Sequence, residues 1–178
     1  MDNIKIHDKY FEPFILFDKI DNAVTKIAEN INKDIEGKTP IFLVILNGSF
    51  MFAGDLLKKI NLPCEVSFVK LASYIGTKST EKVRQLIGFD EDIKGRTIII
   101  IEDIIDSGIT MENVLNQLES MGAADVRIAT LLFKPEAFQK SYKIDYVGLK
   151  IPNDFIVGYG LDYDSHGRNL KDIYKIIE

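Results

Sequence analysis

The turn at residues 102–110 combines acidic, hydroxyl and glycine residues at a spacing that can bind a phosphorylated sugar. Glu102 and Asp103 end an apolar run, and a third acid, Asp106, follows them. Small residues then close the turn, namely Ser107, Gly108 and Thr110. Such residues bind phosphate through hydroxyl and backbone N–H groups, whereas adjacent carboxylates suit ribose hydroxyls or a Mg²⁺ ion held partly through water. The pattern therefore favours a sugar-phosphate ligand.

The elements on either side place this turn at a ligand-binding edge. Four consecutive isoleucines at 98–101 predict a strand buried on both faces, as in a parallel sheet. Apolar residues at helical spacing predict a helix over 111–121: Met111, Val114, Leu115, Leu118 and Met121. The acids thus lie between the carboxyl end of a strand and the amino end of a helix. Open α/β sheets bind ligands at that edge, and a helix N-terminus favours phosphate.

The rest of the chain alternates between helical and strand patterns. Helices are predicted over 18–36 and from the turn at Asn47-Gly48 to about residue 60. Strands are predicted over 41–46, from residue 63 onward, and over 126–133, 145–149 and 155–159. Residues 73–85 are polar and aperiodic, which predicts a mobile loop. This alternation predicts an α/β fold with a parallel sheet and right-handed crossovers.

Length and composition predict one soluble domain spanning residues 1–178. The chain is 46% hydrophobic and 28% charged, which is ordinary for a globular protein, and its net charge of −5 argues against nucleic-acid binding. No apolar run is long enough for a transmembrane helix, so no membrane partner is expected. The single Cys64 cannot form an internal disulfide, which suits a reducing compartment. A cytoplasmic location is therefore expected.

The turn at 102–110 resembles the phosphoribosyl-pyrophosphate (PRPP) binding motif of type I phosphoribosyltransferases, which has two acids, two hydrophobic residues, Asp, Ser or Thr, Gly, any residue and Thr. Within that superfamily the chain resembles the hypoxanthine(-guanine) phosphoribosyltransferases. Four further segments fit in order: LNGSFMFAGDLL from Leu46, ASYIGT from Ala72, LLFKPEAF from Leu131 and IPNDFIVGYGLDYDSHGRNL from Ile151. The resemblance thus covers nearly the whole chain.

This resemblance implies a fold and an activity. The fold would be a central parallel five-stranded sheet flanked by helices, with a small hood from about residues 1–17 and 150–178. The activity would be Mg²⁺-dependent transfer of ribose 5-phosphate from PRPP to N9 of a 6-oxopurine, hypoxanthine and guanine being the expected bases. The products would be a nucleoside 5′-monophosphate and pyrophosphate. The resemblance also implies a homodimer or homotetramer.

For the PRPP motif, the resemblance assigns a role to each residue. Asp106 would accept the proton from N7 of the purine. Glu102 and Asp103 would contact the ribose and the water ligands of Mg²⁺. The 5′-phosphate would be held by the residues of the turn that follows, together with Asp106: Ser107, Gly108, Ile109 and Thr110.

Other segments would bind the purine and the pyrophosphate. Lys134 would donate to O6 of the base, with Phe155 and Ile156 stacking on it and lining it. Asp162 would lie at the purine site and help hold the metal. The pyrophosphate would be bound by Arg168 and by two loops, the first containing Asn47 and Gly48 and the second, a closing lid, containing Ser73 and Tyr74.

The chain departs from the family pattern at two positions. Asn47 stands where many relatives have Lys before the glycine, which removes one positive charge but keeps the backbone N–H contacts. Ile109 replaces a frequent Lys in the phosphate loop. Neither departure removes a predicted catalytic group.

Other interpretations of the same residues remain open from the sequence. Asp106 could simply cap the following helix, and Lys134 could be a solvated strand end. A PRPP-sensing regulator on the same fold is an alternative to an enzyme, although the chain lacks the basic excess of a nucleic-acid binder. A phosphoacceptor signalling domain fits less well. Such a domain has its acidic pair after the first strand and its phosphoacceptor Asp well before the Lys-Pro, whereas here only one strand separates the acids from Lys134. His7 and His166 are isolated in the sequence and offer no metal site, so they are expected to be solvated or hydrogen-bonded surface residues.

Overall fold

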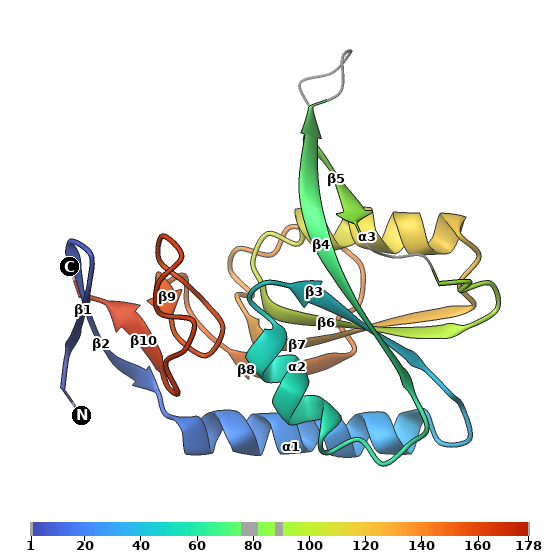
Figure 1. Cartoon of the computed structure of the whole chain (residues 1–178), viewed down its shortest axis with the longest axis horizontal. Coiled ribbons are helices and arrows are strands. Elements are labelled where there is room, and N and C mark those ends of the chain that lie inside the picture. Colours follow the sequence, from blue (N-terminus) through green and yellow to red (C-terminus); the bar gives the residue numbers. More distant parts are fainter. Residues whose placement is uncertain (1, 76–81, 88–90, 178) are drawn as a thin grey trace.

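Two sheets with different strand patterns make up the fold (Figure 1). This computed structural model describes the backbone of residues 2–75, 82–87 and 91–177, and the side chains of 2–71 and 91–177. The larger sheet has the strand order β5-β4-β3-β6-β7-β8. Its strands are β3 (Ile41–Leu46), β4 (Glu65–Ile75), β5 (Lys82–Ile87), β6 (Thr97–Ile105), β7 (Asp125–Phe133) and β8 (Tyr146–Lys150).

Five strands of the larger sheet run parallel, from β4 through β3, β6 and β7 to β8. The predicted five-stranded parallel core is therefore confirmed. Its central strands are continuous apolar runs because both of their faces are covered: Ile98 to Ile101 of β6 are all fully buried. The sixth strand, β5, was not predicted, and it pairs antiparallel with the end of β4.

The loop predicted over residues 73–85 is wrong for both of its ends. Residues 73–75 belong to β4 and residues 82–85 to β5, in a hairpin where Ser73 pairs with Arg84 and Tyr74 with Val83. The two strands of a hairpin at a sheet edge hydrogen-bond to each other through their backbones. Such a pair can form without an alternation of apolar and polar residues, so the sequence showed no strand pattern here. The centre of the predicted loop, 76–81, lies outside the described residues.

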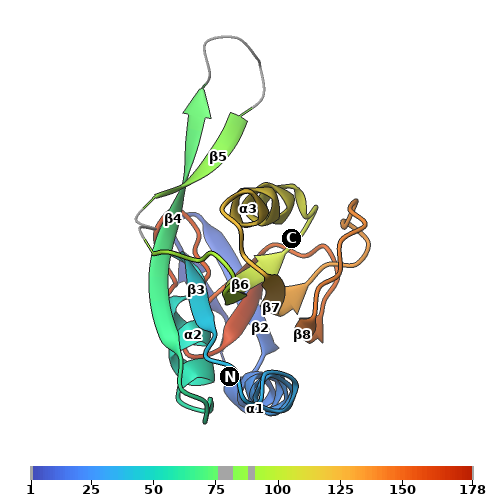
Figure 2. The same cartoon turned by 90° about the vertical axis from the view of Figure 1, so that its right-hand side faces the viewer.

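Within the described parts of the chain, three helices cover the two faces of the larger sheet. α1 (Phe17–Asp34) and α2 (Phe50–Leu57) lie on one face, and α3 (Ile109–Ser120) lies on the other (Figure 2). The alternation of side chains along β3 divides the core between them. Phe42 and Val44 pack with α1 and α2, whereas Leu43 and Ile45 pack with α3. Among the described residues, none of the helices has the length and apolar character needed to span a bilayer.

The second sheet joins the two ends of the chain and forms the predicted hood. Its antiparallel strands are β1 (Ile4–Ile6), β2 (Lys9–Ile15), β10 (Ile173–Ile176) and β9 (Ile156–Val157). A small core of Ile6, Phe11 and Val157 holds these strands together. The hood is joined to α1, where the Phe17 N–H donates to the Asp172 carboxylate at 2.7 Å.

Candidate active site

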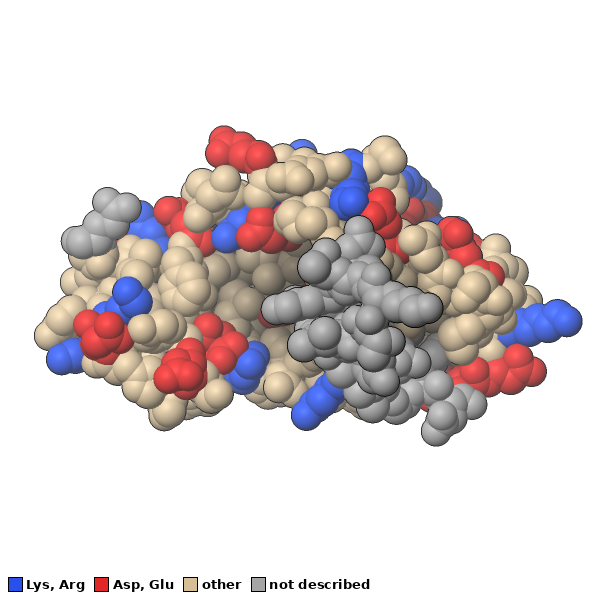
Figure 3. Space-filling model, turned by 90° about the horizontal axis from the view of Figure 1, so that it is seen from above, with Lys and Arg blue, Asp and Glu red and all other residues tan. Residues whose placement is uncertain are grey.

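A cavity of about 380 Å³ opens at the carboxyl edge of the larger sheet. It lies between β3 and β6, where the chain order of the strands changes direction, which is the usual ligand site of open α/β sheets. Figure 3 shows the hollowed surface beside the grey atoms. Ten of the predicted site residues line the cavity: Asn47, Gly48, Glu102, Asp103, Asp106, Ser107, Gly108, Thr110, Asp162 and Arg168.

The turn between β6 and α3 is built to present backbone N–H groups. Gly108, and not Asp106, is the N-cap of α3, with φ of +81°, and the Ile109 N–H at the start of the helix donates to the Ser107 hydroxyl at 3.5 Å. The capping interpretation of Asp106 is therefore wrong. The amino end of a helix favours an anion, and Thr110 adds a hydroxyl group within the first turn. Ile109 is half-exposed and is absent from the described lining of the cavity.

Gly108 cannot be replaced without strain. Replacement by Ala should lower the free energy of unfolding by roughly 2–4 kcal/mol, since a Cβ group at this φ is disfavoured and would lie 2.6 Å from the Phe138 ring and 2.7 Å from the Tyr142 oxygen. Urea denaturation would measure the loss. Gly37→Ala is the matched control, because Gly37 has a φ of +78° and nothing within 4 Å of the added carbon. Equal losses in the two variants would contradict the packing argument.

Lys134 lies beside Asp106, the predicted proton acceptor. The Lys134 Nζ atom is 3.8 Å from Asp106 Oδ2, the Lys134 side chain is 11% exposed, and that of Asp106 is 58% exposed. The two residues follow the neighbouring strands β7 and β6, and the Lys134 N–H donates to the Ile105 carbonyl at 3.0 Å. A donor and an acceptor from adjacent strand ends therefore lie side by side, with Asp106 in the described lining of the cavity and Lys134 outside it.

The loop after β3 lies directly against the acids of the PRPP motif. The Gly48 Cα is so close to the Asp103 carboxylate that a side chain at position 48 would overlap it. The peptide bond between Leu46 and Asn47 is cis. The buried Ser49 hydroxyl donates back to the Ile45 carbonyl, which holds the loop to its strand. The absence of a side chain at Gly48 thus leaves room for Asp103.

Residues 158–168 of the hood, called the hood loop below, form the opposite wall of the cavity. The Arg168 guanidinium contacts Asp162 Oδ1 at 2.6 Å and donates to the Gly160 carbonyl at 2.7 Å. The other Asp162 oxygen accepts the Ser165 N–H at 2.7 Å. Arg168 is therefore held in place as a cation, and the other charged residues in the described lining of the cavity are acidic.

The remaining predicted residues lie outside the described lining of the cavity. Phe155 is 46% exposed, and its ring lies 6.3 Å from that of Phe11 and 5.8 Å from that of Tyr163. Ile156 is buried within β9. The side chains of Ser73 and Tyr74 lie outside the described residues, so their predicted pyrophosphate contacts stay predictions.

The donor set of the cavity fits Mg²⁺ held mainly by substrate and water. The described residues contain no group of three or more His, Cys, Asp or Glu side chains that could hold a metal. Glu102 and Asp103 supply carboxylates on one wall, whereas both oxygens of Asp162 already accept contacts. Mg²⁺ binds through one or two carboxylates plus phosphates and waters, so Glu102 and Asp103 suit it.

The two histidines are hydrogen-bonded surface residues of the hood, as expected, with the ring nitrogens of His7 and His166 2.9 Å apart. The structure also adds two residues to the site. Leu71 of β4 lines the cavity, although its sequence context marks it only as a strand residue. The side chain of Tyr159, a residue of the hood loop, is fully buried. The sequence does give one indication of the importance of Tyr159: it lies between two glycines, which indicate a tightly folded backbone.

Residues 17–164 match the family described as the phosphoribosyl transferase domain. The chain therefore belongs to the phosphoribosyltransferase family. Two relatives named hypoxanthine-guanine phosphoribosyltransferase are similar over most of its length. That of Lactococcus lactis is 45% identical over 82% of this chain and 79% of its own, and that of Streptococcus pneumoniae is 42% identical over 86% of each.

Solved structures of similarly named proteins share the fold. A hypoxanthine phosphoribosyltransferase from Staphylococcus aureus matches 93% of this chain and 91% of its own, at 35% identity with a TM-score of 0.85. A hypoxanthine-guanine phosphoribosyltransferase from Bacillus anthracis matches 94% of this chain and 97% of its own, at 33% identity and the same TM-score. These matches confirm the type I phosphoribosyltransferase fold that the sequence predicted.

Proposed function

We propose that this protein is a Mg²⁺-dependent hypoxanthine(-guanine) phosphoribosyltransferase. In the reaction, N9 of the base bonds to C1′ of PRPP while the bond from C1′ to pyrophosphate breaks. The single observation that carries the proposal is the cavity, which is lined by Asp106, the amino end of α3 and Arg168, with the Lys134 Nζ atom 3.8 Å from Asp106. The names of the similar proteins support the same activity.

Each group has a task that follows from its chemistry. Asp106 accepts the proton from N7 of the base, and Lys134, which has only N–H donors, binds O6. The amino end of α3 binds the 5′-phosphate through backbone N–H groups and Thr110. Arg168 stabilises the negative charge on the departing pyrophosphate. Phe155 stacks on the base, and Asn47 and Gly48 bind the pyrophosphate through their backbone.

Mg²⁺ would be held by Glu102 and Asp103, and its chemistry is to neutralise charge on the pyrophosphate group. The need for it follows from the lining of the cavity. Four carboxylates, those of Glu102, Asp103, Asp106 and Asp162, face the ligand, whereas Arg168 is the one cation among the described lining residues. A polyanion entering this space alone would be repelled, so the proposal includes a strict metal requirement.

The proposal is tested by incubating the protein with PRPP, Mg²⁺ and hypoxanthine. Inosine 5′-monophosphate and pyrophosphate should form in equal amounts, and EDTA should abolish the reaction until excess Mg²⁺ is added. Chromatography would measure the nucleotide and an enzymatic assay the pyrophosphate. Failure to form nucleotide with hypoxanthine or guanine would refute the function, whereas full turnover in EDTA would refute only the metal requirement.

The cytoplasmic location and the assembly into dimers or tetramers remain parts of this proposal. The same holds for a lid that excludes water from the reacting centre. Its predicted tip contains Ser73 and Tyr74 at the end of β4, and the residues that follow, 76–81, lie outside the described part of the chain.

A further inference from the structure

We infer that Tyr159 and Asp55 form a positioning pair that fixes the hood loop against the loop after β3 and so sets the affinity for pyrophosphate. The inference rests on the proposed function, because it takes pyrophosphate to bind between these two loops. Neither residue lines the cavity among the described residues, so both would act through others.

Tyr159 anchors the hood loop in the main hydrophobic core. Its side chain is 1% exposed, and its ring packs 6.3 Å from that of Phe17 at the start of α1. The backbone has a φ of +48°, which is uncommon for a bulky residue, and the Tyr159 N–H donates to the Leu170 carbonyl at 2.9 Å. Burial of the ring therefore holds the backbone of the hood loop in one conformation.

The polar end of Tyr159 is bonded to α2. The hydroxyl donates to Asp55 Oδ2 at 2.7 Å, and the other oxygen of Asp55 accepts from Lys58 at 2.7 Å. Burial acts to raise the pKa of Asp55, but the hydrogen bonds from Lys58 and Tyr159 outweigh it and lower that pKa. Burial, followed by the bond to Asp55, raises the pKa of Tyr159. The bond thus joins a neutral phenol to a carboxylate, which makes it stronger than a neutral pair.

The residue after Tyr159 brings the two walls of the cavity into contact. The Gly160 Cα lies against the Gly48 carbonyl so closely that a side chain there would overlap it. The Gly160 N–H donates to the Arg168 carbonyl at 2.9 Å, and its own carbonyl accepts from the Arg168 guanidinium. α2 begins just after Gly48 and carries Asp55. The Tyr159–Asp55 bond therefore fixes Arg168 relative to Gly48.

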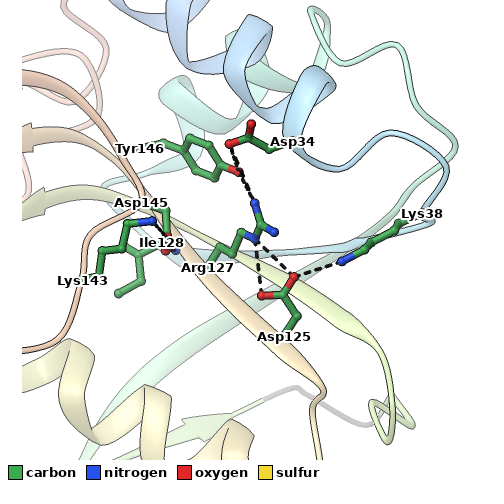
Figure 4. Close-up of polar contacts among 8 residues, drawn as sticks. All are labelled: Asp34, Lys38, Asp125, Arg127, Ile128, Lys143, Asp145 and Tyr146. Atoms are coloured by element: carbon green, nitrogen blue, oxygen red, sulfur yellow. Dashed lines mark hydrogen bonds and ion pairs between the residues drawn. The ribbon is translucent and has the colours of Figure 1, made fainter.

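A purely structural tyrosine would affect only stability, and the chain offers a matched control for that. Tyr146 is 4% exposed, accepts a hydrogen bond from Arg127 at 3.0 Å and donates to Asp34 at 3.3 Å (Figure 4). It is the first residue of β8, at the amino edge of the parallel strands and therefore away from the cavity. Tyr146→Phe removes a buried hydroxyl bonded to a carboxylate without touching either wall.

The test is calorimetric titration of the whole protein with pyrophosphate in excess Mg²⁺ and, separately, with inosine 5′-monophosphate. Tyr159→Phe should weaken pyrophosphate binding about tenfold, the order expected for one lost hydrogen bond to a charged group, and change nucleotide binding less than threefold. Tyr146→Phe should change neither affinity.

Asp55→Asn keeps an acceptor, so its pyrophosphate affinity should stay within threefold of that of the parent, whereas Asp55→Ala should lose as much affinity as Tyr159→Phe. The double variant Tyr159→Phe, Asp55→Ala should lose no more affinity for pyrophosphate than either single variant, because both substitutions remove the same hydrogen bond.

The outcomes separate this inference from the proposed function. A parent protein that binds neither ligand would overturn the function, and the pair's role with it. If the parent binds both ligands, an unchanged pyrophosphate affinity in Tyr159→Phe would refute the positioning role of the pair and leave the proposed function intact. An equal loss of both affinities, or the same loss in Tyr146→Phe, would do so too, because it would indicate general destabilisation.

Discussion

Replacing Asp106 by Asn should lower kcat by about 10²–10⁴-fold while the protein stays folded and still binds PRPP, because a positioned acid–base group contributes that much. Asn has nearly the same shape but cannot take the proton from N7. The structure favours this outcome because Asp106 does not cap α3, so its loss leaves no helix terminus uncapped. Single-turnover kinetics with hypoxanthine would measure the effect on the chemical step.

Asp34→Asn is a matched control for Asp106→Asn. Asp34 is 46% exposed, compared with 58% for Asp106, and it lies 3.8 Å from Arg127, the same distance as that between Asp106 and Lys134. Both substitutions therefore remove one charge from a partly exposed ion pair, but only one of these pairs lies at the cavity. A kcat within about threefold of the parent in Asp106→Asn, or a similar fall in Asp34→Asn, would rule out the proton-acceptor role.

The parallel sheet could be predicted from the sequence because its strands are buried on both faces. Burial on both faces requires unbroken apolar runs such as 98–101 and 41–46, and these runs are visible without any structure. The hairpin of β4 and β5 could not be predicted. Backbone pairing holds these strands together, so their sequence carries no periodic pattern of apolar residues.

Residues of the site that lie close together in the sequence could be predicted, whereas contacts between distant segments could not. The PRPP motif could be predicted because one strand–turn–helix segment contains the acids, Gly108 and Thr110 together. The contact of Gly160 with Gly48 and the bond from Tyr159 to Asp55 join residues more than a hundred positions apart. No local pattern encodes such a contact, because it depends on where the hood is placed on the larger sheet.

Adenine should be a very poor substrate, with a kcat/KM as much as about 10⁴-fold below that of hypoxanthine. The Lys134 side chain is 11% exposed and offers only N–H donors, which suit the O6 acceptor of hypoxanthine or guanine. Adenine presents an amino group at that position, so two donors would face each other with little water to solvate either. A buried polar group left unpaired in this way costs more than a missing contact in an apolar pocket.

Lys134→Ala should weaken the use of hypoxanthine without producing an efficient adenine enzyme, because removing the donor leaves no acceptor for the adenine amino group. Lys140→Ala is the control, since the Lys140 side chain is also largely buried, at 24% exposed, but pairs with Glu112 of α3 at 2.7 Å. Steady-state assays of the parent and both variants with each base would give the ratios of kcat/KM. Comparable values for adenine and hypoxanthine in the parent would overturn both the role of Lys134 and the assignment to 6-oxopurines. An equal loss of hypoxanthine use in the two variants would mean that Lys134 acts through general stability and not through O6.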